Sequence, residues 1–145
     1  MTELLRIQNL TVDLPAGADR PHALKDLTLS VNAGEIVCVV GESGSGKSLT
    51  AGAILGLLPQ GVHASGGQIH WEGQDLLQLA PNALRRLRGR RIGMIFQEPM
   101  TALNPLRTIG DQIGEVFRTH TRLGRAEIAR RTLELLDSVR LPDPA

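Results

Sequence analysis

Apolar and polar residues alternate along two early segments of the chain, residues 4–14 and 23–31, with the period of two that is typical of β-strands. A turn-rich loop with two prolines, residues 15–21, separates these segments. Residues 36–40 (IVCVV) form a continuous apolar run, the pattern of a strand that is buried on both faces of a sheet. The single cysteine, Cys38, lies in this run and is therefore expected to be a buried, unreactive thiol.

Helical and strand patterns alternate along the rest of the chain. Helices are predicted from apolar spacing and from proline or glycine stop signals at residues 49–58, 81–87, 108–120 and 125–139. A loop is expected at residues 61–67, a turn at residues 72–75, and further strands at residues 68–71 and 91–96. This order of elements indicates an α/β or α+β fold.

The composition limits the function classes. With 41% hydrophobic and 21% charged residues, the 145-residue chain is globular, and a net charge of +1 provides no overall field for nucleic acid or an anionic membrane. No apolar stretch approaches the roughly 18 residues of a membrane span, and the N-terminus lacks the pattern of a signal peptide. A dense arginine run at residues 85–91 has no interleaved aromatic residues, so it is interpreted as a solvated face rather than a nucleic-acid site.

The strongest chemical signal is the run GESGSGKS. It matches the pattern GxxxxGKS between a predicted buried strand and a predicted helix, and it consists of Gly41, Glu42, Ser43, Gly44, Ser45, Gly46, Lys47 and Ser48. Glycines allow backbone N–H groups to converge on a phosphate chain, and the start of the helix adds its dipole. In this pattern Lys47 reaches the β- and γ-phosphates and the Ser48 hydroxyl binds Mg²⁺. The run therefore predicts a nucleoside triphosphate site.

A second polar position follows the predicted strand at residues 91–96. Gln97 stands directly after the apolar run, where its amide oxygen can ligate Mg²⁺ or hold water, and a surface glutamine is the alternative interpretation. Glu98 is one place too far along for a metal ligand at the strand end and precedes a proline.

These motifs, in this order, resemble the ATPase of ATP-binding-cassette (ABC) transporters. GESGSGKS resembles the family's Walker A motif, and residues 91–106 (RIGMIFQEPMTALNPL) resemble its Q-loop in the wording of the oligopeptide, dipeptide and nickel importer subgroup. The resemblance covers essentially all 145 residues. It implies a P-loop NTPase fold of the α/β class, with an N-terminal antiparallel β subdomain and the start of a helical subdomain.

The resemblance also implies a division of the chain and a role for each site residue. Residues 1–35 and 65–78 would form the antiparallel β region, residues 36–60 and 91–98 the P-loop core, and residues 99–145 the start of the helical subdomain. ATP and Mg²⁺ would be bound by residues 41–48 with Leu49 beside them. Gln97 would be the catalytic residue that senses Mg²⁺ and the attacking water.

Two departures from the family pattern stand out. The position that usually stacks an aromatic ring on adenine is Leu14, which offers apolar contact only, and His22 is the alternative contact. The family's LSGGQ-type signature, Walker B strand and switch histidine are missing before Ala145. We therefore expect an incomplete domain that is marginally stable by itself and does not turn over ATP alone.

The resemblance implies a peripheral protein on the cytoplasmic face of the inner membrane. Its partners would be transmembrane permease subunits, a second ABC ATPase subunit and, indirectly, an extracytoplasmic solute-binding protein, with no nucleic acid. Peptide is the first expectation for the cargo and nickel or another small solute the second. A non-hydrolysing nucleotide-binding or regulatory module is an alternative function, and a DNA-acting ABC ATPase is disfavoured by the wording of the Q-loop.

Overall fold

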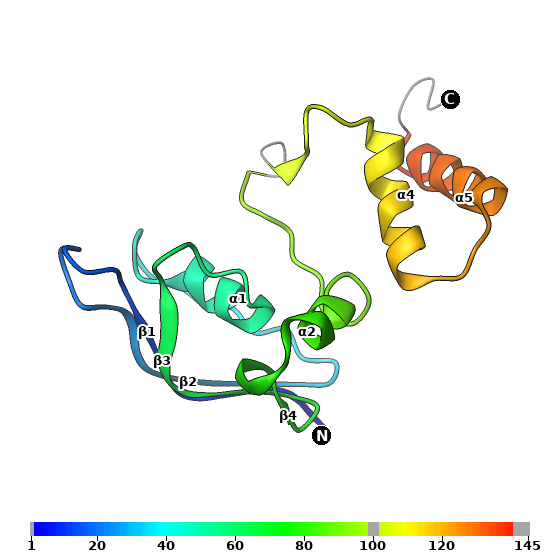
Figure 1. Ribbon diagram of the computed structural model, residues 1–145. Coiled ribbons are helices and arrows are strands. Elements are labelled where there is room, and N and C mark those ends of the chain that lie inside the picture. Colours follow the sequence, from blue (N-terminus) through cyan, green and yellow to red (C-terminus); the bar gives the residue numbers. More distant parts are fainter. Residues whose placement is uncertain (1, 99–101, 141–145) are drawn as a thin grey trace. The chain divides into compact units, whose positions relative to one another are not determined.

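The computed structural model describes residues 2–98 and 102–140 of the chain. The chain folds as two compact units, Met1–Arg88 and Gly89–Ala145. The first unit carries a sheet with helices beside it, and the second carries a pair of helices (Figure 1). Within the described ranges, no helix combines the length and the apolar character that crossing a bilayer requires.

The sheet of the first unit is antiparallel and has the strand order β2-β1-β3-β4. The strands are β1 Glu3–Asp13, β2 His22–Asn32, β3 His63–Trp71 and β4 Gln74–Asp75. The two strands predicted from early alternation are thus confirmed. The predicted loop at residues 61–67 is wrong from residue 63 onward, because β3 starts at His63, where it pairs with Asp13 at the end of β1.

A β-bulge in β1 explains a break in its hydrophobic alternation. Leu5 and Ile7 are buried at odd positions, whereas Leu10 and Val12 are buried at even positions. Between them Asn9 has a φ of 49°, and the pairing register with β2 shifts. Because an extra residue flips the faces of a strand, the bulge keeps both apolar pairs in the same core.

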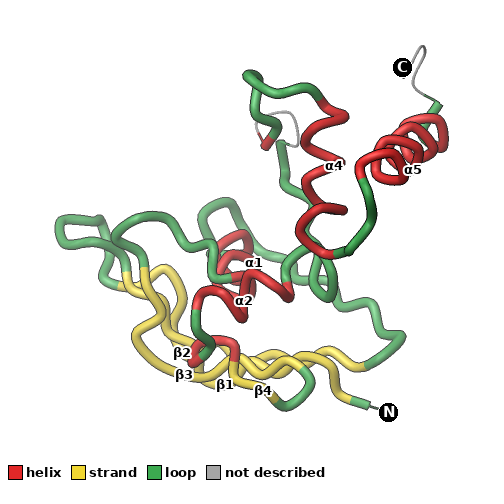
Figure 2. Tube along the Cα trace, turned by 45° about the vertical axis from the view of Figure 1, so that its right-hand side comes forward, coloured by secondary structure: helices red, strands yellow, loops and turns green. Residues whose placement is uncertain are grey.

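Helices cover one face of this sheet. Figures 1 and 2 both show α1 (Lys47–Leu55) and α2 (Pro81–Leu87) on the same side of it. The prediction at residues 81–87 is confirmed, but the helix predicted at residues 49–58 ends at Leu55. The reason is Gly56, whose φ of 61° and flanking backbone bonds stop the helix before the proline at position 59.

Arg88 joins the C-terminal ends of α1 and α2. Its Nε donates to the carbonyl oxygen of Leu55 at 2.6 Å and its Nη2 to that of Gly56 at 3.0 Å. A guanidinium at this point satisfies carbonyl groups that the helix leaves open and opposes the negative end of its dipole. Arg88 belongs to the arginine run that the sequence presents as solvated surface, so this structural role was missed.

The two apolar runs predicted as buried strands are not strands in the structure. Residues 36–40 lie outside the four-stranded sheet, with Ile36 91% and Val40 89% exposed. Residues 91–96 likewise form no strand, and Ile95 is 93% exposed. Cys38 is exposed, so the prediction of a buried thiol is wrong. The physical reason is that a strand requires hydrogen-bonded neighbours, which the described sheet does not supply to these segments.

The second unit contains α4 (Ile109–His120) and α5 (Arg125–Ser138), close to the helices predicted at residues 108–120 and 125–139. The N-terminus of α4 is capped by Thr108, whose Oγ1 accepts from the Asp111 amide at 3.1 Å. The helices approach closely at Gly114, where a Cβ atom would lie 3.4 Å from Ile128 Cγ2. Gly114 is buried at this contact, so α4 and α5 pack against each other there.

Candidate functional site

The glycine-rich run of residues 41–46 leads directly into α1. Gly46 precedes the helix with a φ of 93°, a backbone conformation that favours glycine. A Cβ atom there would lie 2.4 Å from Leu24 Cδ2 and 3.0 Å from the carbonyl oxygen of Ala23. Glycine at position 46 thus allows the loop both to turn into the helix and to lie against β2.

Lys47 folds back onto the loop that precedes it. Its Nζ donates to the carbonyl oxygens of Gly41 at 2.8 Å and Glu42 at 2.7 Å, and to Ser45 Oγ at 3.3 Å. The backbone is tight here, because a Cβ atom at Gly41 would lie 2.8 Å from Ser45 Oγ. The loop therefore holds an ammonium group in place by its own carbonyl oxygens.

The first turn of α1 offers hydrogen-bond donors to an anion. No side chain caps the N-terminus of this helix, so the N–H groups of its first turn have no side-chain acceptor at the cap position. Lys47 and Ser48 are exposed in that turn, and Leu49 is half-buried behind them. Buried Thr50 fixes the turn through its Oγ1, which donates to the Gly46 carbonyl at 3.1 Å. These residues fit a phosphate chain and a hydroxyl-bound cation.

Leu14 and His22 lie at the ends of the β1–β2 loop. Both line an open hollow of about 460 Å³, together with His63. The Nδ1 atom of His22 lies 2.6 Å from Asp13 Oδ1, and this hydrogen bond is the largest of the influences that lower the pKa of Asp13. Because His22 is already hydrogen-bonded to Asp13, it is a weaker candidate for a contact with the adenine base. Leu14 remains a predicted apolar contact.

Arg20 contacts the glycine-rich run of residues 41–46, which we call the phosphate loop after its predicted role. The sequence did not predict this contact. Its Nη2 donates to the carbonyl oxygen of Gly44 at 2.6 Å. The contact joins residues 24 positions apart, so no local motif marks it. Gly46 lies against Ala23 and Leu24 at the start of β2, and this packing brings the neighbouring β1–β2 loop close to the glycine-rich run.

Gln97 belongs to the second unit, where it is exposed. Its assignment to Mg²⁺ and to the attacking water stays a prediction, as does the assignment of Ser48 to Mg²⁺. Part of the predicted Q-loop segment, residues 99–101, lies outside the described residues.

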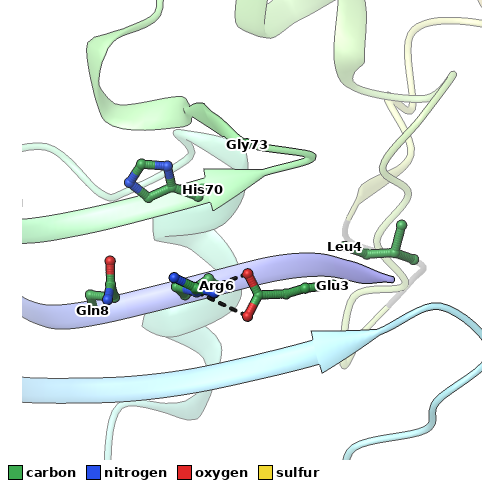
Figure 3. A pocket seen from close by; sticks show the side chains of 6 residues that line it. All are labelled: Glu3, Leu4, Arg6, Gln8, His70 and Gly73. Carbon is green, nitrogen blue, oxygen red and sulfur yellow. Dashed lines mark hydrogen bonds and ion pairs between the residues drawn. The ribbon is translucent and has the colours of Figure 1, made fainter. Parts of the chain in front are cut away.

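A separate hollow of about 260 Å³ opens over β1 and β3 and contains charged groups (Figure 3). Arg6 lies between Gln8 and Glu3 there, and its Nε is 2.8–2.9 Å from the carboxylate oxygens of Glu3. His70 stands on the neighbouring strand, paired with Arg6. Because Glu3 neutralises the guanidinium, this hollow is a poorer anion site than the phosphate loop.

Comparison with known proteins identifies a family that matches this chain. Residues 24–145 match the family model described as ABC transporter. The chain is 48% identical over 143 residues to the "Probable D,D-dipeptide transport ATP-binding protein DdpD" of Escherichia coli, covering 97% of this chain and 43% of that protein. It is 43% identical over 145 residues to the oligopeptide transport ATP-binding protein OppD of Mycobacterium tuberculosis, covering 99% of this chain and 24% of that protein. The chain thus spans less than half the length of these relatives.

A solved structure shares the fold. The dimeric structure of MJ0796, described as a bacterial ABC transporter cassette, superposes with a TM-score of 0.81 at 27% identity, over 97% of this chain and 59% of that one. The fold class predicted from the sequence is therefore confirmed, and so is the resemblance to peptide transport ATP-binding proteins.

Proposed function

The chain belongs to the ABC transporter family, and we propose that it binds MgATP at residues 41–48 as part of the ATP-binding subunit of a peptide importer. The observation that carries this proposal is the loop geometry, in which Lys47 Nζ lies 2.7–2.8 Å from two loop carbonyls beside an uncapped helix N-terminus. A second structure of MJ0796 is described as bound to ADP and Pi. The nucleotide assignment for this chain rests on its own residues and on family membership.

The proposal gives each predicted contact with MgATP a task. The backbone N–H groups at the start of α1 would donate hydrogen bonds to phosphate oxygens, and the Lys47 ammonium would leave the loop carbonyls and bind the terminal phosphates. The Ser48 hydroxyl would hold Mg²⁺, which would supply neutralising charge. Leu14 and Leu49 provide apolar contacts near the nucleotide. The proposed role of Gln97, by resemblance to the family alone, is to orient the attacking water.

The names of the relatives support a proposal for the cargo and the partners. The relatives are named for D,D-dipeptide, oligopeptide and peptidoglycan transport, so a peptide cargo is proposed over nickel. An importer subunit of this kind would dock on permease subunits at the cytoplasmic face of the membrane and pair with a second ATPase subunit. We propose that hydrolysis requires that assembly and that the chain by itself binds without turnover.

Equilibrium binding of MgATP to the 145-residue protein tests this proposal. Calorimetry should show saturable binding that Lys47→Ala weakens by about 100-fold, because a charged partner of the phosphates is lost. Lys25→Ala removes the protein's other lysine and should leave the affinity unchanged. Equal affinities of the unaltered and Lys47→Ala proteins would refute the site. Sustained phosphate release by the chain alone would refute the requirement for assembly.

A further inference from the structure

The loop between β1 and β2 is braced at its base. The Leu14 amide donates to the Pro21 carbonyl at 2.9 Å, and the Ala18 amide donates to the Pro15 carbonyl at 3.2 Å. Prolines restrict the backbone at both of these points. Arg20 therefore projects from a closed loop, so ordering its side chain costs less entropy than it would on a free tail.

Arg20 and Lys47 hold different carbonyls of the same phosphate loop. Lys47 holds those of Gly41 and Glu42, and Arg20 holds that of Gly44 through a short charge-assisted bond of 2.6 Å. Gly44 has a φ of 79°, and a Cβ atom there would meet nothing within 4 Å. The peptide between Gly44 and Ser45 is held from both sides, because Arg20 donates to its carbonyl oxygen and its own amide donates to the Glu42 carbonyl at 3.2 Å.

We propose that Arg20 is a positioning residue of the nucleotide site, which holds the Gly44 peptide so that the loop is preformed for a polyphosphate. This inference rests on the proposed nucleotide function. A loop that contains three glycines loses conformational freedom when it binds, and fixing its tip beforehand reduces that cost. Since Arg20 acts through the loop backbone, its effect should be the same for every ligand that carries a triphosphate group.

A different role for Arg20 would be direct stacking on the base. Its loop also carries Leu14, which stands where the family usually places an aromatic ring, and guanidinium groups stack on aromatic systems. Stacking would favour ATP over a ligand without a base. Inorganic tripolyphosphate, which has the phosphates alone, therefore separates the two roles.

The test measures the affinities of the 145-residue protein for MgATP and for magnesium tripolyphosphate. Arg20→Ala should weaken both by a similar factor of about threefold to tenfold, the range for one exposed charge-assisted hydrogen bond. Arg20→Lys should recover part of the loss, because it keeps a cationic donor. Arg85→Ala, an exposed arginine of α2, is the matched control and should change neither affinity. Thermal unfolding of all variants should match the unaltered protein.

Three results would overturn the inference. If Arg20→Ala binds both ligands as the unaltered protein does, while Lys47→Ala is weakened, only the role of Arg20 is refuted. If Arg20→Ala weakens MgATP alone, Arg20 contacts the base and does not act through the loop. If the unaltered protein binds neither ligand, the proposed function fails, and the role of Arg20 fails with it.

Discussion

Gly67 of β3 lies so close to Asn9 in the bulge of β1 that a Cβ atom at position 67 would be 2.5 Å from the Asn9 carbonyl oxygen. Gly67 also has a φ of 87°, and the Asn9 amide is held by Thr28 Oγ1 of β2 at 3.0 Å. One irregularity in the central strand thus constrains both neighbouring strands. Its position decides which apolar residues reach the core.

The Gly67→Ala substitution should destabilise the protein by about 2–3 kcal/mol, because it adds a backbone strain and a steric clash. Gly66→Ala is the matched control, since a Cβ atom there meets only Thr11 Cβ at 3.9 Å. Urea unfolding followed by circular dichroism measures both variants. Equal midpoints for the two variants would show that the bulge does not need a glycine opposite it.

The Gly46→Ala substitution should impair nucleotide binding more than Gly44→Ala. Both glycines have positive φ values, but only at Gly46 would a Cβ atom lie within 2.4 Å of the Leu24 side chain. The clash must displace the start of α1 or the end of the loop. MgATP affinity measured by calorimetry checks this order, and equal losses for both variants would refute it.

Removal of the Arg88 side chain should destabilise the contact between the C-terminal ends of α1 and α2. Arg88→Ala leaves the carbonyls of Leu55 and Gly56 without their cationic donor, which should lower the free energy of unfolding by about 1.5–3 kcal/mol. Arg86→Ala, an exposed neighbour in α2, serves as the control and should stay within about 0.5 kcal/mol of the unaltered protein. Chemical denaturation measures the difference, and a variant as stable as the control would contradict the capping role.

The pH dependence of stability should reveal the ion pairs on α5. Hydrogen bonds from Arg130 and then Arg131 lower the pKa of Glu127 from 4.5 to about 2. Because the folded pKa lies below the unfolded one, the stabilisation is fully present above pH 4.5 and is lost as the pH falls toward 2. We expect a Glu127→Gln variant to be less stable than the unaltered protein at pH 7 and to converge with it near pH 2. Thermal unfolding across this range checks the sign, and a difference that grows on acidification would refute it.

Much of the fold could be predicted because it is encoded over short distances in the chain. Helices α2, α4 and α5 follow from their apolar spacing and end signals, within one or two residues of the observed bounds. The turn predicted at residues 72–75 is confirmed at Glu72 and Gly73, whose positive φ values suit a two-residue hairpin, but Gln74 and Asp75 form β4. The start of β3 was missed because its glycine-rich sequence has weak strand propensity and only pairing with β1 makes it a strand.

Other features could not be predicted because apolar patterns record a tendency to be buried but not the partner that buries them. Residues 36–40 have the pattern of an inner strand, yet Ile36 and Val40 are exposed in the described structure. In the sequence, nothing distinguishes Arg88 from the arginines beside it, although its hydrogen bonds to the end of α1 span 32 and 33 positions. Periodicity contains no information on contacts at such separations.

The sequence by itself determined the phosphate loop, because GESGSGKS contacts mainly itself, with Lys47 bonded to residues two to six positions away. The same run, with the Q-loop wording, was enough to indicate the family. Only the tertiary structure decided that Arg20 reaches Gly44 and that Gly67 meets Asn9. The first contact depends on packing of Gly46 against the start of β2, and the second on a bulge in a paired strand. Neither is a property of any single segment.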